Sequence, residues 1–208
     1  ESGEASVGKK RNMGLDLAKG DYVYFLDSDD YVLPGCLNAL MEEAEKSHNQ
    51  VVAGKRMVSW FKKQVYETMS DETNIERNLK DKDHDRLVKV ERKQEKHVYD
   101  NEPEQFKIDL LIRTRHALRN VSCLNLLIKR SLIEDNHISF KEEFFWYTDA
   151  PFVVELLKYT NDVSFVEDAI LVKRKPNDPI NRPALSQIKD PDGRFDEFIE
   201  AHNYCLEI

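Results

Sequence analysis

The chain has 208 residues, of which 40% are hydrophobic and 34% are charged, and its formal net charge is −8. This composition is typical of one soluble globular domain, and the acidic balance argues against nucleic acid as the main partner, because nucleic-acid surfaces require a basic excess. We expect a cytoplasmic chain, since no apolar run approaches the ~20 residues of a spanning helix and the first residues lack the apolar core of a signal peptide.

The first sixty residues predict alternating helices and strands. Residues 15–18 favour a short helical segment that ends at Gly20. Residues 22–26 form a continuous apolar, aromatic-rich run, typical of a central strand that is buried on both faces of a parallel sheet. Pro34 begins a second helical pattern that extends to about residue 47, and residues 50–60 predict a second strand. We therefore expect an α/β core.

Residues 67–104 differ in composition from the rest of the chain. They carry dense mixed charge and no glycine. Because such a segment buries little apolar surface, it predicts a charged insertion that projects from the core and is the most mobile or extended part of the chain. A solvated loop and an arm that contacts an acceptor molecule both agree with this composition.

The second half of the chain predicts further elements of the same single domain, 1–208. They are helices at 106–118, 131–136, 150–159 and 195–206 and strands at 121–128, 163–166 and 169–172. Ser131 is expected to cap its helix. After the last strand the chain predicts a basic turn and then a loop rich in proline and asparagine.

An acidic cluster follows the strand predicted at 22–26. It consists of Asp27, Asp29 and Asp30. Ligands of open α/β sheets bind beyond the carboxyl ends of strands, so the cluster marks a candidate site. Two aspartates at i and i+2 suit Mg²⁺ or Mn²⁺, with a substrate diphosphate and water as the remaining ligands. The alternative is a helix N-cap, in which Asp29 or Asp30 accepts backbone N–H bonds ahead of the next helix.

The stretch GKKRNMGLDLAKGDYVYFLDSDDYVLPGCLNAL, residues 8–40, resembles a known family signature. It resembles the middle signature of family 2 glycosyltransferases of the GT-A fold: an Arg-Asn-x-Gly-Leu helix, a Gly-Asp/Glu-Tyr turn, a strand, and an Asp-x-Asp motif followed by a proline. A looser likeness continues through VSCLNLLIKRSLI and YTDAPFVVELLKY to VKRKPNDP. The stretch KRKPNDPINRPALSQI is similar to glycosyltransferase domains of teichoic acid and capsule biosynthesis proteins.

The resemblance implies residues that hold the nucleotide-sugar donor. Arg11 would contact the nucleotide, Asp27 would bind the ribose, and Asp29 would coordinate the Mn²⁺ or Mg²⁺ that bridges the diphosphate. Arg174 and Lys175 match positions where the family places basic residues near the diphosphate, and a guanidinium suits phosphate oxygens. A solvated basic turn is the alternative for these last two residues.

The resemblance also implies residues on the acceptor side. Asp149 would be the general base, which takes the proton of the acceptor hydroxyl while that hydroxyl attacks the sugar and inverts its anomeric centre. Thr148 stands where the family carries a glutamate before this aspartate. Without the family, Asp149 is interpreted as a helix N-cap. Trp146 and Tyr147 suit stacking on a sugar ring, and burial in the core is their alternative.

The family resemblance further implies an N-terminally truncated GT-A fold, because in the family further strands precede the Arg-Asn-x-Gly helix. The implied function is inverting, metal-dependent transfer of a sugar from a nucleotide-diphosphate sugar, with UDP-sugar expected, to a hydroxyl of a polysaccharide or polyol-phosphate acceptor such as teichoic acid. The alternative is a non-catalytic fragment or interaction domain that keeps the fold. Self-association and peripheral association with the inner face of the cell membrane are further expectations.

Overall fold

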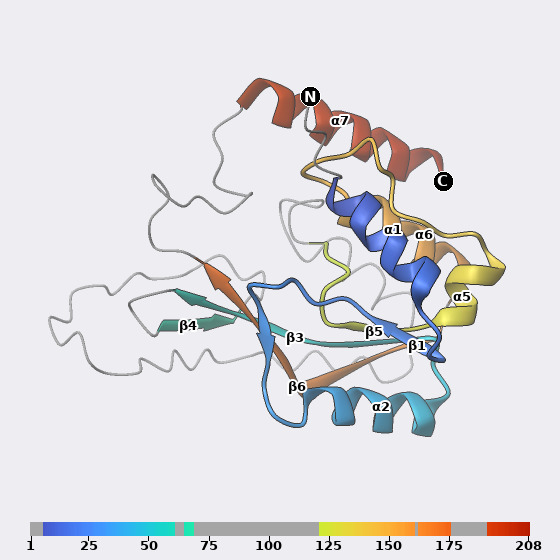
Figure 1. The fold of residues 1–208 in the computed structure, drawn as a ribbon, viewed down its shortest axis with the longest axis vertical. Coiled ribbons are helices and arrows are strands. Elements are labelled where there is room, and N and C mark those ends of the chain that lie inside the picture. Colours follow the sequence, from blue (N-terminus) through green and yellow to red (C-terminus); the bar gives the residue numbers. More distant parts are fainter. Residues whose placement is uncertain (1–5, 61–64, 69–120, 161, 176–190) are drawn as a thin grey trace, which may run out of the picture.

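The computed structural model describes residues 6–60, 65–68, 121–160, 162–175 and 191–208 (Figure 1). The helix expected at 106–118 and almost all of the charged insertion at 67–104 lie outside the described residues. The proline-rich loop after residue 175 lies outside them as well. No helix in the described ranges is both long enough and apolar enough to cross a membrane.

A mixed six-stranded sheet lies at the centre of the described chain. The strands run in the order β1-β5-β3-β6-β2, and β4 pairs with β3 beside this path. β3 is parallel to β6 and antiparallel to β5, and β5 is in turn antiparallel to β1. The strands are β1 (Tyr22–Tyr24), β2 (Tyr31–Val32), β3 (Val51–Trp60), β4 (Val65–Thr68), β5 (Leu126–Lys129) and β6 (Val163–Lys175).

Helices cover both faces of this sheet, so the fold is a layered α/β structure (Figure 1). On one face, α2 (Cys36–Ser47) buries Cys36, Leu40 and Ala44 against the sheet. The other face carries the larger core, which includes Phe25, Phe140 and Phe152. The helices on that face are α1 (Val7–Leu17), α5 (Arg130–Asp135), α6 (Asp149–Tyr159) and α7 (Pro191–Glu207). Burial of these apolar side chains on both faces is the main stabilising contribution.

The strand at 22–26 does not have the expected place. Within the described residues β1 lies at the end of the strand order and pairs with β5 in the antiparallel direction, so the prediction of a central parallel strand is wrong. Its residues Tyr22, Val23 and Tyr24 are only partly buried, and Phe25, just beyond the strand, reaches the core. Aromatic residues with polar ends tolerate this half-exposed position, which the apolar run alone does not distinguish from full burial.

β6 is one long strand, whereas two short strands were expected at 163–166 and 169–172. Gly54 of β3 pairs with Val166, and the next residue, Lys55, pairs with Ile170. The residues 167–169 therefore bulge out of the ladder, and pairing then resumes as far as Lys175. A bulge absorbs the polar residues in the middle of the strand without ending it.

Asn125 holds this irregular part of the sheet together. It is fully buried, and its backbone has a positive φ of 61°. Its side-chain amide donates to the carbonyl oxygens of Lys55 at 2.7 Å and Ala169 at 2.9 Å, and it accepts the Tyr24 hydroxyl at 2.8 Å. A Cβ at Gly54 would lie 2.4 Å from this amide, so the site requires glycine.

Several helix boundaries differ from those expected. The segment predicted at 15–18 is the last part of α1. α5 begins at Arg130, so Ser131 lies inside the helix and the prediction that it caps the helix is wrong. The α6 prediction is confirmed to within one residue, and α7 begins earlier than expected, at Pro191.

Candidate active site

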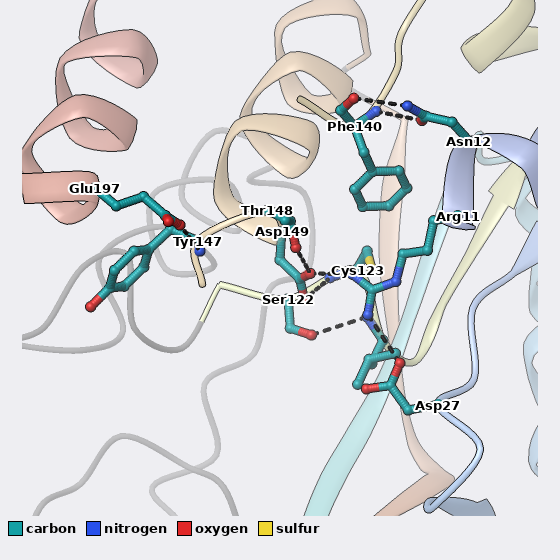
Figure 2. Close-up of polar contacts among 11 residues, drawn as sticks. Arg11, Asn12, Asp27, Ser122, Cys123, Phe140, Tyr147, Thr148, Asp149 and Glu197 are labelled. Carbon is teal, nitrogen blue, oxygen red and sulfur yellow. Dashed lines mark hydrogen bonds and ion pairs between the residues drawn. The ribbon is translucent and has the colours of Figure 1, made fainter. Parts of the chain in front are cut away.

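The guanidinium of Arg11 lies at the centre of the candidate site (Figure 2). Arg11 Nη2 donates to Asp27 Oδ1 at 3.0 Å, and Nη1 forms a short ion pair with Asp149 Oδ1. The side chain is only 12% exposed, and its guanidinium carbon lies 5.2 Å from the centre of the Phe140 ring. The fold therefore brings together three residues that the sequence singled out separately.

Asn12 anchors the helix that carries Arg11. Its amide exchanges two hydrogen bonds with the backbone of Phe140: it donates to the carbonyl at 2.9 Å and accepts the N–H at 2.8 Å (Figure 2). A Cβ at Gly8 would lie 3.2 Å from the Lys141 carbonyl, so this glycine permits close approach of α1. Of these two consecutive residues, Arg11 makes the ion pairs of the site, and Asn12 attaches the helix to the backbone of Phe140.

Asp149 is the first residue of α6, and Thr148 occupies the N-cap position. The interpretation of Asp149 as an N-cap is therefore wrong. Its carboxylate accepts the Cys123 backbone N–H and the Thr148 hydroxyl, each at 3.3 Å, in addition to the ion pair with Arg11. These donors orient the carboxylate toward α1 and the segment before β5.

The charge on Asp149 is stabilised by its neighbours. Burial by itself raises the pKa of the Asp149 carboxyl, but Arg11, a hydrogen bond from Ser122, and Lys173 outweigh burial and hold the pKa below its ordinary value of 3.8. Burial opposes the charge on Arg11 in the same way, yet Asp149 and Asp27 raise the pKa of its guanidinium above the usual value. Asp149 is therefore ionised at neutral pH and able to accept a proton.

The acidic cluster forms a compact group of carboxylates. Among the described residues, Asp27, Asp29 and Asp30 each place a carboxylate oxygen within 4.8 Å of the others. Asp30 is buried: its Oδ1 accepts the Arg174 backbone N–H at 2.9 Å, while its buried Oδ2 accepts no hydrogen bond from the described chain. Burial raises the pKa of Asp30. α2 is capped by Gly35, so the N-cap alternative for this cluster is wrong.

The donor set of this cluster fits a hard divalent cation. Carboxylate oxygens are the ligands that Mg²⁺ and Mn²⁺ prefer, and like charges at this spacing are tolerated when a cation relieves their repulsion. The buried Asp30 Oδ2 is one such oxygen that has no donor among the described residues, and Asp29 is exposed. Asp29, with Asp27 or Asp30 beside it, is the residue group that would hold the ion.

Arg174 lies beside the same cluster. Besides its backbone N–H to Asp30, its Nε donates to the Asp29 carbonyl oxygen in a short contact. It belongs to β6, as does Lys175 at the end of that strand, so these two residues do not form the turn of the alternative interpretation. The side chain of Lys175 lies outside the described part of the chain.

The aromatic residues before α6 divide into two environments. Tyr147 is buried and packs edge-on against Phe198 of α7, with ring centres 5.5 Å apart, so the core alternative holds for it. Trp146 is partly buried, and it packs edge-on against Phe145, which is 46% exposed. An exposed aromatic surface thus lies three to four residues before Asp149.

The sequence interpretation missed several residues of this site. The backbone N–H of Cys123 and the carboxylate of Glu197 left no local pattern, although Glu197 stands at helical spacing with the inward-facing Ala201 and Tyr204. The anchoring role of Asn12 could have been inferred from its place in the Arg-Asn-x-Gly signature. Contacts of this kind join segments that only the fold brings together.

The chain is similar to known glycosyltransferases in part of its sequence. Residues 3–101 match the profile of glycosyl transferase family 2. The poly(ribitol-phosphate) beta-N-acetylglucosaminyltransferase TarP of Staphylococcus aureus strain N315 is 34% identical over 74 residues, which cover 36% of this chain and 22% of TarP. A GalNAc(5)-diNAcBac-PP-undecaprenol beta-1,3-glucosyltransferase of Campylobacter jejuni is 46% identical over 41 residues, covering 20% of this chain and 13% of that protein.

Among solved structures, S. aureus TarS 1–349 in complex with UDP-GlcNAc is similar over 98% of this chain and 48% of the TarS chain. The TM-score is 0.58 at 18% sequence identity. This likeness identifies the fold as GT-A. The chain spans less than a quarter of each of the two curated relatives and about half of that TarS chain.

Proposed function

The chain is a relative of the family 2 glycosyltransferases and has their GT-A fold, and from that premise we propose that it transfers a sugar from a UDP-sugar to an acceptor hydroxyl with inversion. The observation that carries the proposal is the meeting of Arg11, Asp27 and Asp149 beside the acidic cluster. One side of this arrangement suits a diphosphate, and the other suits a hydroxyl that must lose a proton.

Asp149 is the general base in this proposal. It is ionised at neutral pH and held in one orientation by Arg11 and the Cys123 N–H. The acceptor hydroxyl gives its proton to the Asp149 carboxylate as its oxygen forms the new bond to the sugar C1. The bond from C1 to the diphosphate breaks on the opposite face, and the diphosphate leaves with the electron pair.

The ion pair with Arg11 both orients and restrains this base. A carboxylate that is paired with a guanidinium is less basic than a free one, so acceptor binding must turn part of the carboxylate toward the incoming hydroxyl. Asp149 has a second oxygen for this purpose: Oδ1 takes Arg11, and Oδ2 takes the Cys123 N–H at the longer distance of 3.3 Å. Because its contact is the weaker one, Oδ2 is the oxygen that would take the proton in this proposal.

The acidic cluster and Arg174 are the donor side of the site. A divalent ion held by Asp29 would stabilise the negative charge that develops on the leaving diphosphate. Asp27 pairs with Arg11, and in this proposal it would also accept hydrogen bonds from the ribose hydroxyls. Arg174 and Lys175 would supply positive charge to phosphate oxygens.

The relatives support the acceptor class. TarP is named for transfer to poly(ribitol-phosphate), and the Campylobacter relative is named for transfer to a sugar chain on undecaprenol diphosphate. We propose a polyol-phosphate or polysaccharide acceptor, and action in the cytoplasm at the inner face of the membrane, where a lipid-linked acceptor would be met. Trp146 and the exposed Phe145 form the aromatic surface on which such an acceptor would rest.

Calorimetry on the intact protein tests the donor side directly. We expect UDP-GlcNAc to bind in the presence of Mn²⁺ and to bind much more weakly with chelator, and Asp29→Asn to abolish most of the Mn²⁺ effect. Asp135→Asn, a change of an exposed aspartate on α5, is the matched control and should bind as the wild type does. Binding without any transfer of sugar would favour the non-catalytic alternative, and absence of binding would overturn the proposal.

A further inference from the structure

α7 places the carboxylate of Glu197 on its inward face. Glu197 is 8% exposed, and Ala201 and Tyr204, which lie at helical spacing from it, pack on the core. Its Oε1 accepts two backbone N–H groups, from Trp146 at 2.6 Å and from Tyr147 at 2.8 Å. Figure 2 shows Glu197 beside Tyr147. A buried carboxylate is costly unless it is hydrogen-bonded, and these two charge-assisted bonds offset that cost.

The two N–H groups belong to the turn that leads into α6. Thr148 follows Tyr147 directly, is itself buried, and donates its hydroxyl to Asp149 Oδ1 at 3.3 Å. The Tyr147 ring packs against Phe198, the residue after Glu197. α7 therefore holds the backbone of this turn by hydrogen bonds and by packing, two residues before Asp149.

The contacts on Asp149 differ in kind from those of Glu197. Arg11 and the Cys123 N–H act on the carboxylate itself, whereas Glu197 acts on the backbone that carries it. A base must lie within hydrogen-bond reach of the proton that it takes, and a misplacement of about 1 Å can lower the rate by about 10²-fold. The position of this turn is therefore a determinant of rate.

We propose that Glu197 is a positioning residue for Asp149, and that α7 thereby helps to set the position of the general base. The proposal rests on the proposed function, in which Asp149 is the base. Like Asp149, Glu197 lies outside residues 3–101, the segment that matches the family profile. The proposal also assigns a role to a helix that is not part of the proposed donor and metal sites.

Three variants of the intact protein test this role: Glu197→Ala, Glu197→Gln and Tyr204→Phe. Glu197→Ala removes the acceptor of both turn N–H groups. Glu197→Gln keeps an oxygen at the same place and should rescue the turn. Tyr204→Phe is the matched control. It removes a different hydrogen bond of α7, from the Tyr204 hydroxyl to Glu155, and keeps the two hydrogen bonds between Glu197 and the turn.

The measurements are amide hydrogen exchange at Trp146 and Tyr147, and kcat and KM with UDP-GlcNAc. In Glu197→Ala we expect loss of protection at both amides and a kcat lower by about 10- to 100-fold, with the donor KM within about twofold of the wild type. Glu197→Gln and Tyr204→Phe should keep protection and kcat. A purely structural role would instead affect Glu197→Ala and Tyr204→Phe alike.

Normal kcat in Glu197→Ala, or an equal loss of kcat in Tyr204→Phe, would overturn the proposal. If Glu197→Ala fails to fold, Glu197→Asp takes its place, because the shorter carboxylate weakens the same two hydrogen bonds. Full kcat with reduced amide protection in Glu197→Asp also overturns the proposal.

Asp149→Asn in the same assay separates the two proposals. Normal transfer by Asp149→Asn overturns the proposed base and this role with it, whereas normal transfer by Glu197→Ala beside a defective Asp149→Asn overturns this role alone.

Discussion

Arg11 is ion-paired with Asp149, although the two residues stand 138 positions apart in the sequence. The pair joins the first described helix to the start of α6, and the same guanidinium also contacts Asp27 after β1. One buried cation therefore organises two carboxylates for which we propose different tasks, the ribose for Asp27 and the acceptor proton for Asp149.

The first prediction concerns Asp149→Asn in the intact protein. The amide keeps the shape of the side chain but cannot take a proton at neutral pH, so turnover should fall by about 10²- to 10⁴-fold. Donor affinity should stay nearly unchanged, because Asp149 acts on the acceptor. Steady-state kinetics and donor calorimetry measure the two quantities separately.

Asp29→Ala is the contrasting variant for this experiment. It should weaken metal-dependent donor binding as well as turnover, because Asp29 is proposed to act through the ion and the diphosphate. Near-normal transfer by Asp149→Asn, or a loss of donor binding as severe as that of Asp29→Ala, would show that Asp149 is not the base.

The second prediction concerns stability in acid. The pKa of Asp149 is depressed in the folded protein, so its carboxylate contributes stability at pH values above its unfolded pKa, near 3.8, and this contribution is lost as the pH falls through the folded pKa. We expect wild type to be more stable than Asp149→Asn near neutral pH, and the difference to shrink below about pH 4. Urea unfolding at a series of pH values measures it; a difference that stays constant with pH would contradict the assignment.

A third prediction concerns the buried amide of Asn125. Asn125→Ala leaves the Lys55 and Ala169 carbonyls and the Tyr24 hydroxyl without this partner. The free energy of unfolding should fall by about 2–4 kcal/mol, the cost of unsatisfied buried polar groups. The exposed Asn38→Ala on α2 is the control and should change it by less than about 0.5 kcal/mol. Equal effects of both variants would refute the proposed role of the amide.

The fourth prediction compares two glycines. A Cβ at Gly54 would lie 2.4 Å from the Ala169 carbonyl, so Gly54→Ala forces β3 and β6 apart and should cost about 1–3 kcal/mol or more. At Gly14 in α1 a Cβ meets nothing within 4 Å in the described chain, so Gly14→Ala should stabilise the helix by up to about 1 kcal/mol. Thermal unfolding checks both. A destabilised Gly14→Ala would indicate that residues outside the described part pack there.

Local patterns predicted the candidate site better than they predicted the sheet. Asp27 and Asp29 stand out because they follow an apolar run, and Asp149 stands out because a helical pattern begins there. The Arg-Asn-x-Gly signature placed Arg11 in the same site, and its pairing with Asp149 agrees with that placement. The roles of these residues in donor binding and proton transfer stay predictions.

The strand pairing was harder to predict because it depends on distant partners. The apolar run at 22–26 is equally suited to a central strand and to its observed place at the end of the described strand order, and the choice depends on β5, about a hundred residues later. The polar residues Glu167 and Asp168 seemed to separate two strands, yet the bulge opposite Gly54 carries the ladder past them.

By itself, the sequence determined the α/β class, the extent of α6 and the acidic cluster at the end of an apolar strand, because apolar periodicity and helix-start signals act over a few neighbouring residues. Only the tertiary structure decided which charges meet. Arg11 pairs with Asp149, and Glu197 accepts the N–H groups of Trp146 and Tyr147, because the fold brings α1 and α7 to the start of α6. Buried and half-buried charges there need partners, and they find them on segments that are far apart in the sequence.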